Sequence, residues 1–144
     1  MKKIMLVGHT GVGKTTFCQA IYGEELRYQK TQAVELFYNA IDTPGEYLEN
    51  RNLYRALIVT AADADLMVLL QDCTDEQCWF APGFAGIFGK PAIGLVTKID
   101  LAADGQALRD ADEKLELAGC QPIFHISSKE NKGINDVKTY IGLA

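Results

Sequence analysis

Apolar residues along the chain fall into two kinds of segment that alternate. Short, almost continuous apolar runs have the length of strands, and they cover residues 2–8, 65–72, 91–98 and 121–128. Longer segments carry apolar residues at helical spacing, and they cover residues 14–23, 52–64, 104–119 and 133–144. Buried strands alternating with helices are typical of a parallel sheet that is covered on both faces. The pattern therefore predicts a compact, three-layer α/β domain with a mainly parallel sheet.

One further segment has strand character but little length. Residues 33–42, AVELFYNAID, fit either two small antiparallel strands or one strand with an irregular approach. In sheets of this kind, ligands bind at the ends where the parallel strands finish. The loops after residues 7, 42, 97 and 127 are therefore the expected places for a functional site.

Composition limits the class of protein. The 144 residues suit a single domain over 1–144, and the first apolar run is too short for a signal-peptide core or a membrane span. A net charge of −5 argues against a nucleic-acid partner, because phosphate backbones require a basic face. The four cysteines lack the spacing of a zinc site or a disulfide framework. We expect a cytosolic protein with reduced, mostly buried thiols and no membrane insertion.

The loop after the first predicted strand carries the most informative motif. GHTGVGKT, residues 8–15, matches the G-x-x-x-x-G-K-[ST] phosphate-binding loop. Gly8 and Gly13 are expected to adopt backbone angles closed to other residues, so that N–H groups surround an anion. Lys14 can reach the β- and γ-phosphates, and the Thr15 hydroxyl can bind Mg²⁺. The predicted nucleotide-binding residues of this loop are Gly8, Thr10, Gly11, Val12, Gly13, Lys14, Thr15 and Thr16.

The loop after residue 42 adds groups for the metal and the terminal phosphate. IDTPG places Asp42 at the tip of a strand, where its carboxylate can hold Mg²⁺ through water. The Gly45 N–H can bond to a γ-phosphate. Without the phosphate-binding loop upstream, DTPG would indicate little more than a turn.

The last two loops predict which base is bound. VTKID places Thr97, Lys98 and Asp100 after a strand, and Asp100 can accept hydrogen bonds from N1–H and the amino group of guanine. Adenine would leave that carboxylate unpaired, so GTP and GDP are expected in preference to ATP. Lys98 can lay its methylenes on the base. In ISSKEN, residues 126–131, Ser127 joins the loop whose N–H groups at Ser128 and Lys129 can meet the guanine O6.

Taken together, these motifs resemble those of Ras-like small GTPases in order and position. More narrowly, GHTGVGKTT, KTQAVE, DTPGEY and TKIDL are similar to the ethanolamine- and propanediol-utilisation P-loop family (EutP/PduV type). The resemblance implies that Thr31 is the switch threonine that closes over Mg²⁺, with Thr10 and Thr16 as competitors. It also implies a cytosolic bacterial protein linked to metabolic microcompartments, with shell or scaffold proteins as partners.

Several residues depart from the Ras-like pattern. Glu46 stands where glutamine usually orients the attacking water, so it can act as a general base or turn away to pair with Arg51 or Arg55. Thr97 replaces the usual asparagine of the guanine motif. Its hydroxyl can still bond to the phosphate-binding loop, but it makes fewer bonds, which predicts weaker base selectivity than in a typical member. Thr10 replaces a small glycine beside the γ-phosphate. These departures argue for slow hydrolysis rather than against nucleotide binding.

One more departure concerns potassium, and two cations and one aromatic segment have two interpretations each. Gly11 argues against potassium activation, because potassium-activated relatives have asparagine at this position. Arg27 and Lys30 are either solvated charges or cations for the transition state. CWFAPGFAGIFGK, residues 78–90, is rich in aromatic residues that suit either the core or a docking surface.

We predict a protein that binds GTP with Mg²⁺ and hydrolyses it slowly as a switch. The predicted catalytic residues are Lys14, Glu46 and Thr31, and the predicted metal ligands are Thr15, Thr31 and Asp42. One alternative is an ATP-dependent phosphotransferase that acts on acetate or a similar carboxylate. Another is a nucleotide-dependent docking module with negligible turnover.

Overall fold

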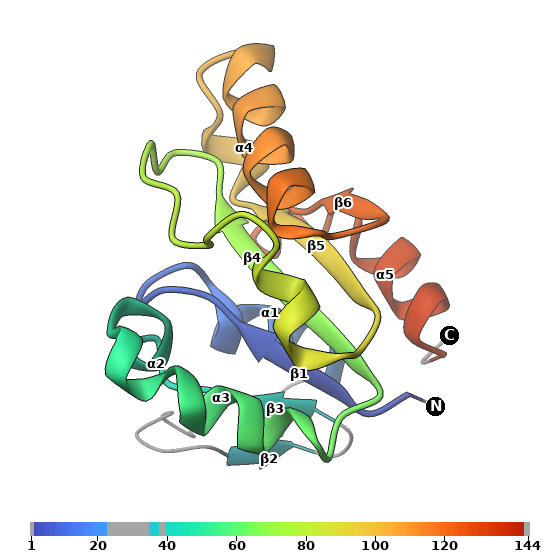
Figure 1. The fold of residues 1–144 in the computed structure, drawn as a ribbon. Coiled ribbons are helices and arrows are strands. Elements are labelled where there is room, and N and C mark those ends of the chain that lie inside the picture. The colour runs from blue at the N-terminus through green and yellow to red at the C-terminus, as the bar shows by residue number, and fades with distance from the viewer. Residues whose placement is uncertain (1, 23–34, 38–39, 143–144) are drawn as a thin grey trace.

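The computed structural model describes residues 2–22, 35–37 and 40–142, and these form a six-stranded sheet (Figure 1). The strand order is β2-β3-β1-β4-β5-β6. The strands are β1 (Ile4–Val7), β2 (Glu35–Phe37), β3 (Ala40–Asp42), β4 (Leu66–Asp72), β5 (Ala92–Thr97) and β6 (Ile123–His125). Only β2 runs antiparallel to its neighbour. The mainly parallel sheet is confirmed, and residues 33–42 contain the two short antiparallel strands of the first alternative.

Helices connect the strands as the sequence pattern predicts, with shorter bounds. The α-helices are α1 (Lys14–Tyr22), α2 (Glu46–Glu49), α3 (Tyr54–Ala61), α4 (Gly105–Ala118) and α5 (Ile134–Ile141). The 3₁₀ helices are η2 (Arg51–Leu53), η3 (Phe84–Phe88) and η4 (Ile99–Leu101). The carboxylate of Asp104 accepts a hydrogen bond from Ala107 N–H at 3.1 Å, so it caps the start of α4. Gly119, at φ 102°, ends α4 in the left-handed region.

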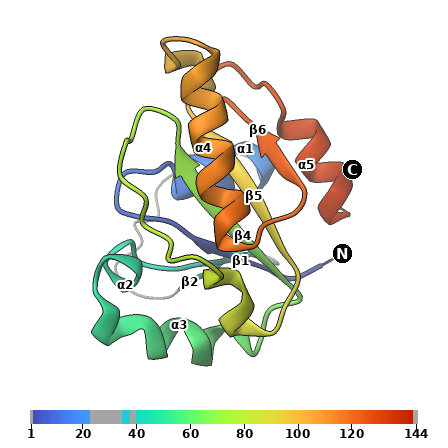
Figure 2. The ribbon, with the colours of Figure 1, turned by 45° about the horizontal axis from the view of Figure 1, so that its top comes forward.

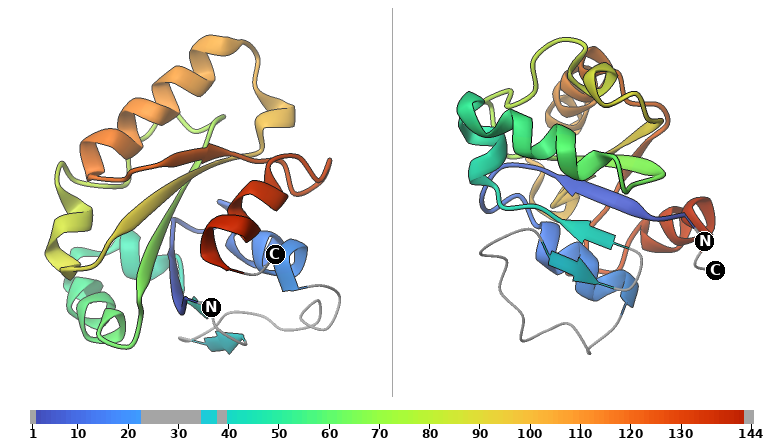
Figure 3. Two further views of the ribbon diagram at one scale, coloured as in Figure 1. Left: turned by 90° about the vertical axis from the view of Figure 1, so that its right-hand side faces the viewer. Right: turned by 60° about the horizontal axis from the view of Figure 1, so that its bottom comes forward.

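The sheet separates two hydrophobic cores, because successive side chains of a strand point to opposite faces. Met5 and Val7 contribute to the core beneath α3 and α4, whereas Ile4 and Leu6 contribute to the core beneath α1 and α5. The two helix layers are seen on either side of the sheet in Figure 3, left. Figure 2 shows α4 lying over β4 and β5. The three-layer α/β prediction is therefore confirmed.

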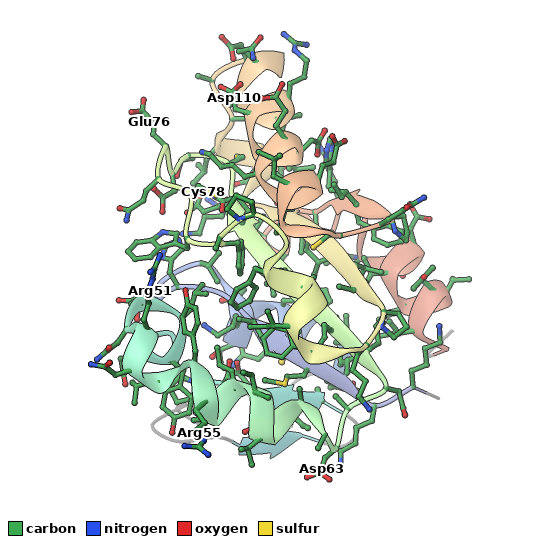
Figure 4. All side chains as sticks on the ribbon, in the orientation of Figure 1. Arg51, Arg55, Asp63, Glu76, Cys78 and Asp110 are labelled. Atoms are coloured by element: carbon green, nitrogen blue, oxygen red, sulfur yellow. The ribbon has the colours of Figure 1, made fainter. Side chains whose placement is uncertain are left out.

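The aromatic segment mostly fills the first of these cores. Phe80, Phe84 and Phe88 are buried, and Trp79 is partly buried against the same cluster. Packing as the principal role of this segment is confirmed. The prediction of mostly buried thiols is also confirmed, because three of the four cysteines are buried, and Cys78, labelled in Figure 4, is exposed.

The parallel strands finish at one edge of the sheet, so the loops that follow β1, β3, β4 and β5 adjoin one another there. Within the described residues, no helix combines the length and the apolar character that crossing a bilayer requires.

Candidate nucleotide-binding site

The phosphate-binding loop joins β1 to α1 through backbone angles that glycine permits. Gly13 has φ 106° and Gly11 has φ 85°, both in the left-handed region. The prediction of such an angle at Gly8 is wrong, because Gly8 is not among the positive-φ residues. Glycine is needed there for space instead, since a Cβ atom would lie 2.6 Å from Val12 Cγ1.

Lys14, the first residue of α1, is buried and folded back onto the loop. Lys14 is only 8% exposed, and its Nζ donates a hydrogen bond to the Gly8 carbonyl at 2.9 Å. Burial lowers the pKa of the Lys14 ammonium, while the carboxylates of Asp42 and Glu49 oppose that shift. A buried cation among carbonyl oxygens and carboxylates is stabilised by any further anion that approaches the loop.

Asp42 and Thr15 come together from different elements at the predicted metal position. Asp42 ends β3 beside Leu6 of β1 and is fully buried. The Thr15 hydroxyl donates to its Oδ2 at 3.3 Å. A carboxylate and a hydroxyl are hard oxygen donors of the type that Mg²⁺ takes in phosphate sites, so the residues present fit this ion.

The loop after β3 is fixed tightly against the phosphate-binding loop. The Thr43 hydroxyl donates to the Leu6 carbonyl at 2.7 Å, which anchors the turn to β1. Gly45 then approaches Thr10 so closely that a Cβ atom on Gly45 would collide with Thr10 N and Oγ1. This close approach, rather than a special backbone angle, requires glycine at position 45.

Glu46, at the start of α2, is exposed. Among the described residues, it forms no ion pair with Arg51 or Arg55, so that alternative is not seen here. Both arginines are exposed, and Figure 4 shows them on the outer side of η2 and α3, apart from each other. They do not gather into a pocket for a carboxylate substrate.

Glu49, at the end of α2, makes a contact that the sequence motifs do not reveal. Its Oε2 accepts two hydrogen bonds from Thr10, at 2.7 Å from the backbone N and at 2.6 Å from Oγ1. The hydrogen bond from the Thr10 side chain, followed by that from its backbone, lowers the pKa of the Glu49 carboxyl. The Glu49 carboxylate is therefore hydrogen-bonded to the loop that is predicted to bind phosphate.

A pocket of about 220 Å³ adjoins the phosphate-binding loop on the side of β5. Its lining consists of Val12, Gly13, Thr16, Thr97, Lys98, Asp100, Leu101, Ser128 and Lys129. Every predicted base-binding residue except Ser127 lines it, so the sequence motifs converge on one place. Ser127 lies directly behind it and is fully buried.

Thr97 and Lys98 tie the base pocket to the phosphate-binding loop. The Thr97 hydroxyl donates to the Val12 carbonyl at 2.9 Å, which is the bond expected of a threonine at this position. Lys98 Nζ donates to the Gly11 carbonyl at 2.8 Å and lies 3.0 Å from Asp72 Oδ2. These bonds hold Lys98 at φ 60°, an angle that is uncommon for a residue with a side chain.

Asp100 is held in the pocket by Ser127. The Ser127 hydroxyl donates to Asp100 Oδ1 at 2.8 Å and accepts from Glu130 N–H at 3.1 Å. The backbone of Ser127 is itself paired with Lys132 in both directions. Within the described residues, the N–H groups of Ser128 and Lys129 donate to no other group, so they can bond to a ligand.

Asp72 is a supporting residue that no sequence motif predicts. Burial by itself raises the pKa of this carboxyl, but hydrogen bonds from Thr74 and the contact with Lys98 outweigh burial, so the pKa lies below its usual value. A polar residue at the end of β4, beside the other loop-bearing strands, is the signal that points to it.

A second missed cluster joins the phosphate-binding loop to the aromatic segment. The ring of His9 stacks on Trp79 with the centroids 5.0 Å apart. Asp75 Oδ2 lies 3.1 Å from His9 Nε2 and accepts a hydrogen bond from Trp79 Nε1 at 2.9 Å. Asp75 and Trp79 lie at least 66 positions after His9 in the sequence, so the spacing of the motifs does not predict these contacts.

A larger hollow of about 700 Å³ lies between α4 and the loop after β4. The carboxylates of Asp104, Asp110 and Glu113 line it, together with Lys114. An excess of negative charge disfavours a polyphosphate there. The smaller pocket beside the phosphate-binding loop is therefore the better candidate for the base of a nucleotide.

The predicted switch threonine, Thr31, and the two cations Arg27 and Lys30 lie outside the described residues.

The order of the loops and the three-layer sheet define a P-loop GTPase type of α/β domain. The FeoB G-domain of Methanococcus jannaschii has this fold: it is 22% identical, with a TM-score of 0.64, over 99% of this chain and 96% of that one. Residues 1–143 match the family described as "Ethanolamine utilisation - propanediol utilisation", and the chain belongs to this family.

Two relatives in this family carry different functional names. The propanediol utilization protein PduV of Citrobacter freundii is 45% identical over 98% of this chain and 93% of its own length. The protein of Escherichia coli named "Probable acetate kinase EutP" is 34% identical over 98% of this chain and 89% of its own length. The family is therefore established, and of these two names only the second states an activity.

Proposed function

We propose that this protein binds GTP with Mg²⁺ and hydrolyses it slowly as a switch. The observation that carries the proposal is the placement of Asp100 in a pocket next to the phosphate-binding loop, with Ser127 fixing one carboxylate oxygen. The guanine N1–H and amino group are the donors that such a carboxylate accepts. Adenine offers no matching pair, so it would leave the carboxylate without the two partners that guanine supplies.

Lys14 and the amides of the phosphate-binding loop hold the β- and γ-phosphates in this proposal. The ammonium exchanges its bond to the Gly8 carbonyl for bonds to phosphate oxygens, because a charge-assisted pair is stronger than a bond to a neutral carbonyl. The positive angles at Gly11 and Gly13 turn the backbone of the loop toward the anion. Gly45 supplies a further N–H for the terminal phosphate.

Mg²⁺, when bound, neutralises charge that builds up on the phosphates during transfer. Thr15 supplies its hydroxyl as a ligand, and Asp42 orients the hydration shell. Thr31 is proposed as a further ligand.

Glu46 is proposed to orient the attacking water or to accept its proton. Its exposed position beside Gly45 allows it to turn toward the loop without breaking an ion pair with a described residue. A carboxylate near a phosphate is repelled by like charge, which is consistent with slow turnover.

The family supports a role in ethanolamine or propanediol utilisation in the bacterial cytoplasm. Shell or scaffold proteins of a microcompartment are proposed as partners, with the nucleotide state of the loops deciding the interaction. A docking role for the aromatic segment has little support, because its three phenylalanines are buried.

The second candidate is an ATP-dependent kinase that acts on acetate, and the name of the Escherichia coli relative favours it. In this reaction the acetate oxygen attacks the γ-phosphorus and ADP leaves. Such an enzyme needs cations for the acetate carboxylate, but Arg51 and Arg55 are exposed and lie apart from each other. GTP hydrolysis is therefore the function that the site supports better.

Two measurements on the wild-type protein test the proposal. Titration with mant-GTP and mant-ATP is expected to show tighter binding of the guanine nucleotide, and equal affinities would remove the role of Asp100. Phosphate release from GTP is expected to be independent of acetate. Acetyl-phosphate formation that depends on acetate and ATP would favour the kinase.

A further inference from the structure

We propose that Glu49 makes the site discriminate between nucleoside triphosphates and diphosphates, because its carboxylate competes with the terminal phosphate for the phosphate-binding loop. The inference rests on the proposed function, since it concerns the same nucleotide site. Glu49 lies in no part of the recognised motifs. Its contact with Thr10 spans 39 positions of sequence and connects α2 directly to the loop.

The contact has the geometry of an anion bound to the loop. One oxygen, Glu49 Oε2, accepts both the backbone N–H and the hydroxyl of Thr10, at 2.7 and 2.6 Å. These are the lengths of charge-assisted hydrogen bonds. The backbone N–H belongs to the same loop as the amides that are proposed to hold phosphate, so the carboxylate already occupies one amide of this loop.

Charge makes the contact sensitive to a further anion. Glu49 is ionised at neutral pH, the two bonds from Thr10 lower its pKa further, and its charge acts on the Lys14 ammonium. A terminal phosphate that approaches Lys14 and Gly45 therefore meets a negative charge at close range. Since Gly45 lies directly against Thr10, the phosphate nearest to Gly45 is the one that faces Glu49.

The position of Glu49 on the loop explains why the effect distinguishes the two nucleotides. Whereas Gly45 lies directly against Thr10, Gly13 and the start of α1 lie beyond Thr10 along the loop. A diphosphate that is held there leaves the bond between Glu49 and Thr10 in place. A triphosphate extends toward Gly45 and expels the carboxylate, and with it the end of α2, so α2 reports which nucleotide is bound.

The central test compares Glu49→Gln with Glu76→Gln as the matched control. Glutamine can accept the same hydrogen bonds without the charge, and Glu76 is an exposed carboxylate on another loop that projects into solvent (Figure 4). With mant-GDP and a mant-labelled, non-hydrolysable GTP analogue, Glu49→Gln is expected to raise triphosphate affinity about 10-fold. Its diphosphate affinity is expected to change less than about 2-fold, and Glu76→Gln to change neither.

A second measurement follows the contact itself. In ¹H–¹⁵N NMR spectra of the wild-type protein, the Thr10 amide is expected to keep its shift with GDP and to move on addition of the triphosphate analogue. Glu49→Ala is expected to move the same resonance in the GDP complex.

The outcomes separate this inference from the proposed function. A wild-type protein that binds neither nucleotide overturns both. A protein that binds both nucleotides, but whose ratio of affinities is unchanged by Glu49→Gln or whose Thr10 amide does not respond, overturns the role of Glu49 alone.

Discussion

The two ends of the candidate site differ in how far they are prepared for a ligand. At the base end, Ser127 fixes Asp100, and Thr97 and Lys98 are bonded to the phosphate-binding loop. At the phosphate end, Lys14 bonds to the loop's own carbonyl, and Glu49 bonds to Thr10. In the proposed function, binding a base would leave these contacts in place, whereas binding phosphates would replace the bond of Lys14 and a terminal phosphate would also replace the bond of Glu49.

This difference assigns separate tasks to the two ends. A rigid pocket discriminates well between bases, because a wrong base leaves buried groups without partners. A loop whose internal bonds compete with the ligand responds to the number of phosphates, because each added charge shifts the balance between the two sets of bonds. In this proposal, the fit of the pocket selects the base, and the exchange of bonds at the loop distinguishes the triphosphate from the diphosphate. The predictions below test this division.

The largest effect is expected from Lys14→Ala, which removes the cation of the phosphate end. Loss of the charge-assisted bonds to two phosphates is expected to weaken GTP and GDP binding about 1,000-fold. Mant-nucleotide titration measures it, with Lys2→Ala on the exposed N-terminal segment as the control. Retained affinity would show that the loop does not bind polyphosphate.

Asp100→Ala removes the group that selects the base. The preference for GTP over ATP is expected to fall about 300-fold, because two bonds to a charged acceptor are lost. ATP affinity is expected to stay the same, since the phosphate end is untouched. Competition titrations measure the ratio, with Asp63→Asn, an exposed aspartate in Figure 4, as the control. An unchanged ratio would contradict the assignment of guanine.

Glu46→Ala tests the chemical step at the phosphate end. Removal of a group that orients or deprotonates water is expected to slow single-turnover GTP hydrolysis about 100-fold. Binding of GTP is expected to be preserved, because the Glu46 side chain is exposed and forms no ion pair with a described residue. Quenched-flow measurement of phosphate formation gives the rate, and an unchanged rate would exclude a catalytic role for this carboxylate.

Ser127→Ala loosens the base end without removing its carboxylate. Loss of the bond to Asp100 Oδ1 is expected to lower the preference for GTP over ATP about 10-fold, because Asp100 is no longer held in place. The same titrations apply, and Ser128→Ala on the neighbouring position provides the comparison, since its side chain makes no bond to Asp100 among the described residues. Equal effects of the two variants would show that Ser127 does not position Asp100.

The smallest effect is expected at Asp72, which anchors Lys98 between the two ends, and it concerns the stability of the fold. Because the pKa of Asp72 is lowered in the folded protein, its carboxylate stabilises the fold above the unfolded pKa, and this contribution is lost as the pH falls through the folded pKa. Asp72→Asn is expected to reduce the free energy of unfolding at pH 7 by about 1 kcal/mol and to flatten its decline below pH 4. Urea unfolding at several pH values measures this. An unaltered pH profile would remove the stabilising role of the pair with Lys98.

Much of the fold and the outline of the site follow from the sequence, because strands and the loops that follow them have recognisable local sequence patterns. The alternation of Ile4, Met5, Leu6 and Val7 between two cores is such a pattern, and so is the phosphate-binding loop. The bond from Thr97 to that loop was also predictable, since a strand-end hydroxyl has few other partners.

The contacts between loops were not predictable from spacing. Glu49 reaches Thr10, and Asp75 reaches His9, only because strands distant in the sequence finish at one edge of the sheet. A motif records which residues lie on a loop, but it does not record which charged side chain of another loop will face them. The reason for glycine at position 8 was not predictable either, because it depends on how closely the backbone packs against the Val12 side chain.

The stacking of Trp79 on His9 gives the molecule a built-in optical reporter. The chain contains a single tryptophan, so emission under tryptophan-selective excitation at 295 nm or longer has one origin, directly against the second residue of the phosphate-binding loop. Rearrangement of that loop alters the surroundings of the indole. Stopped-flow fluorescence can therefore time the arrival and departure of unlabelled nucleotide, with no dye attached to either molecule.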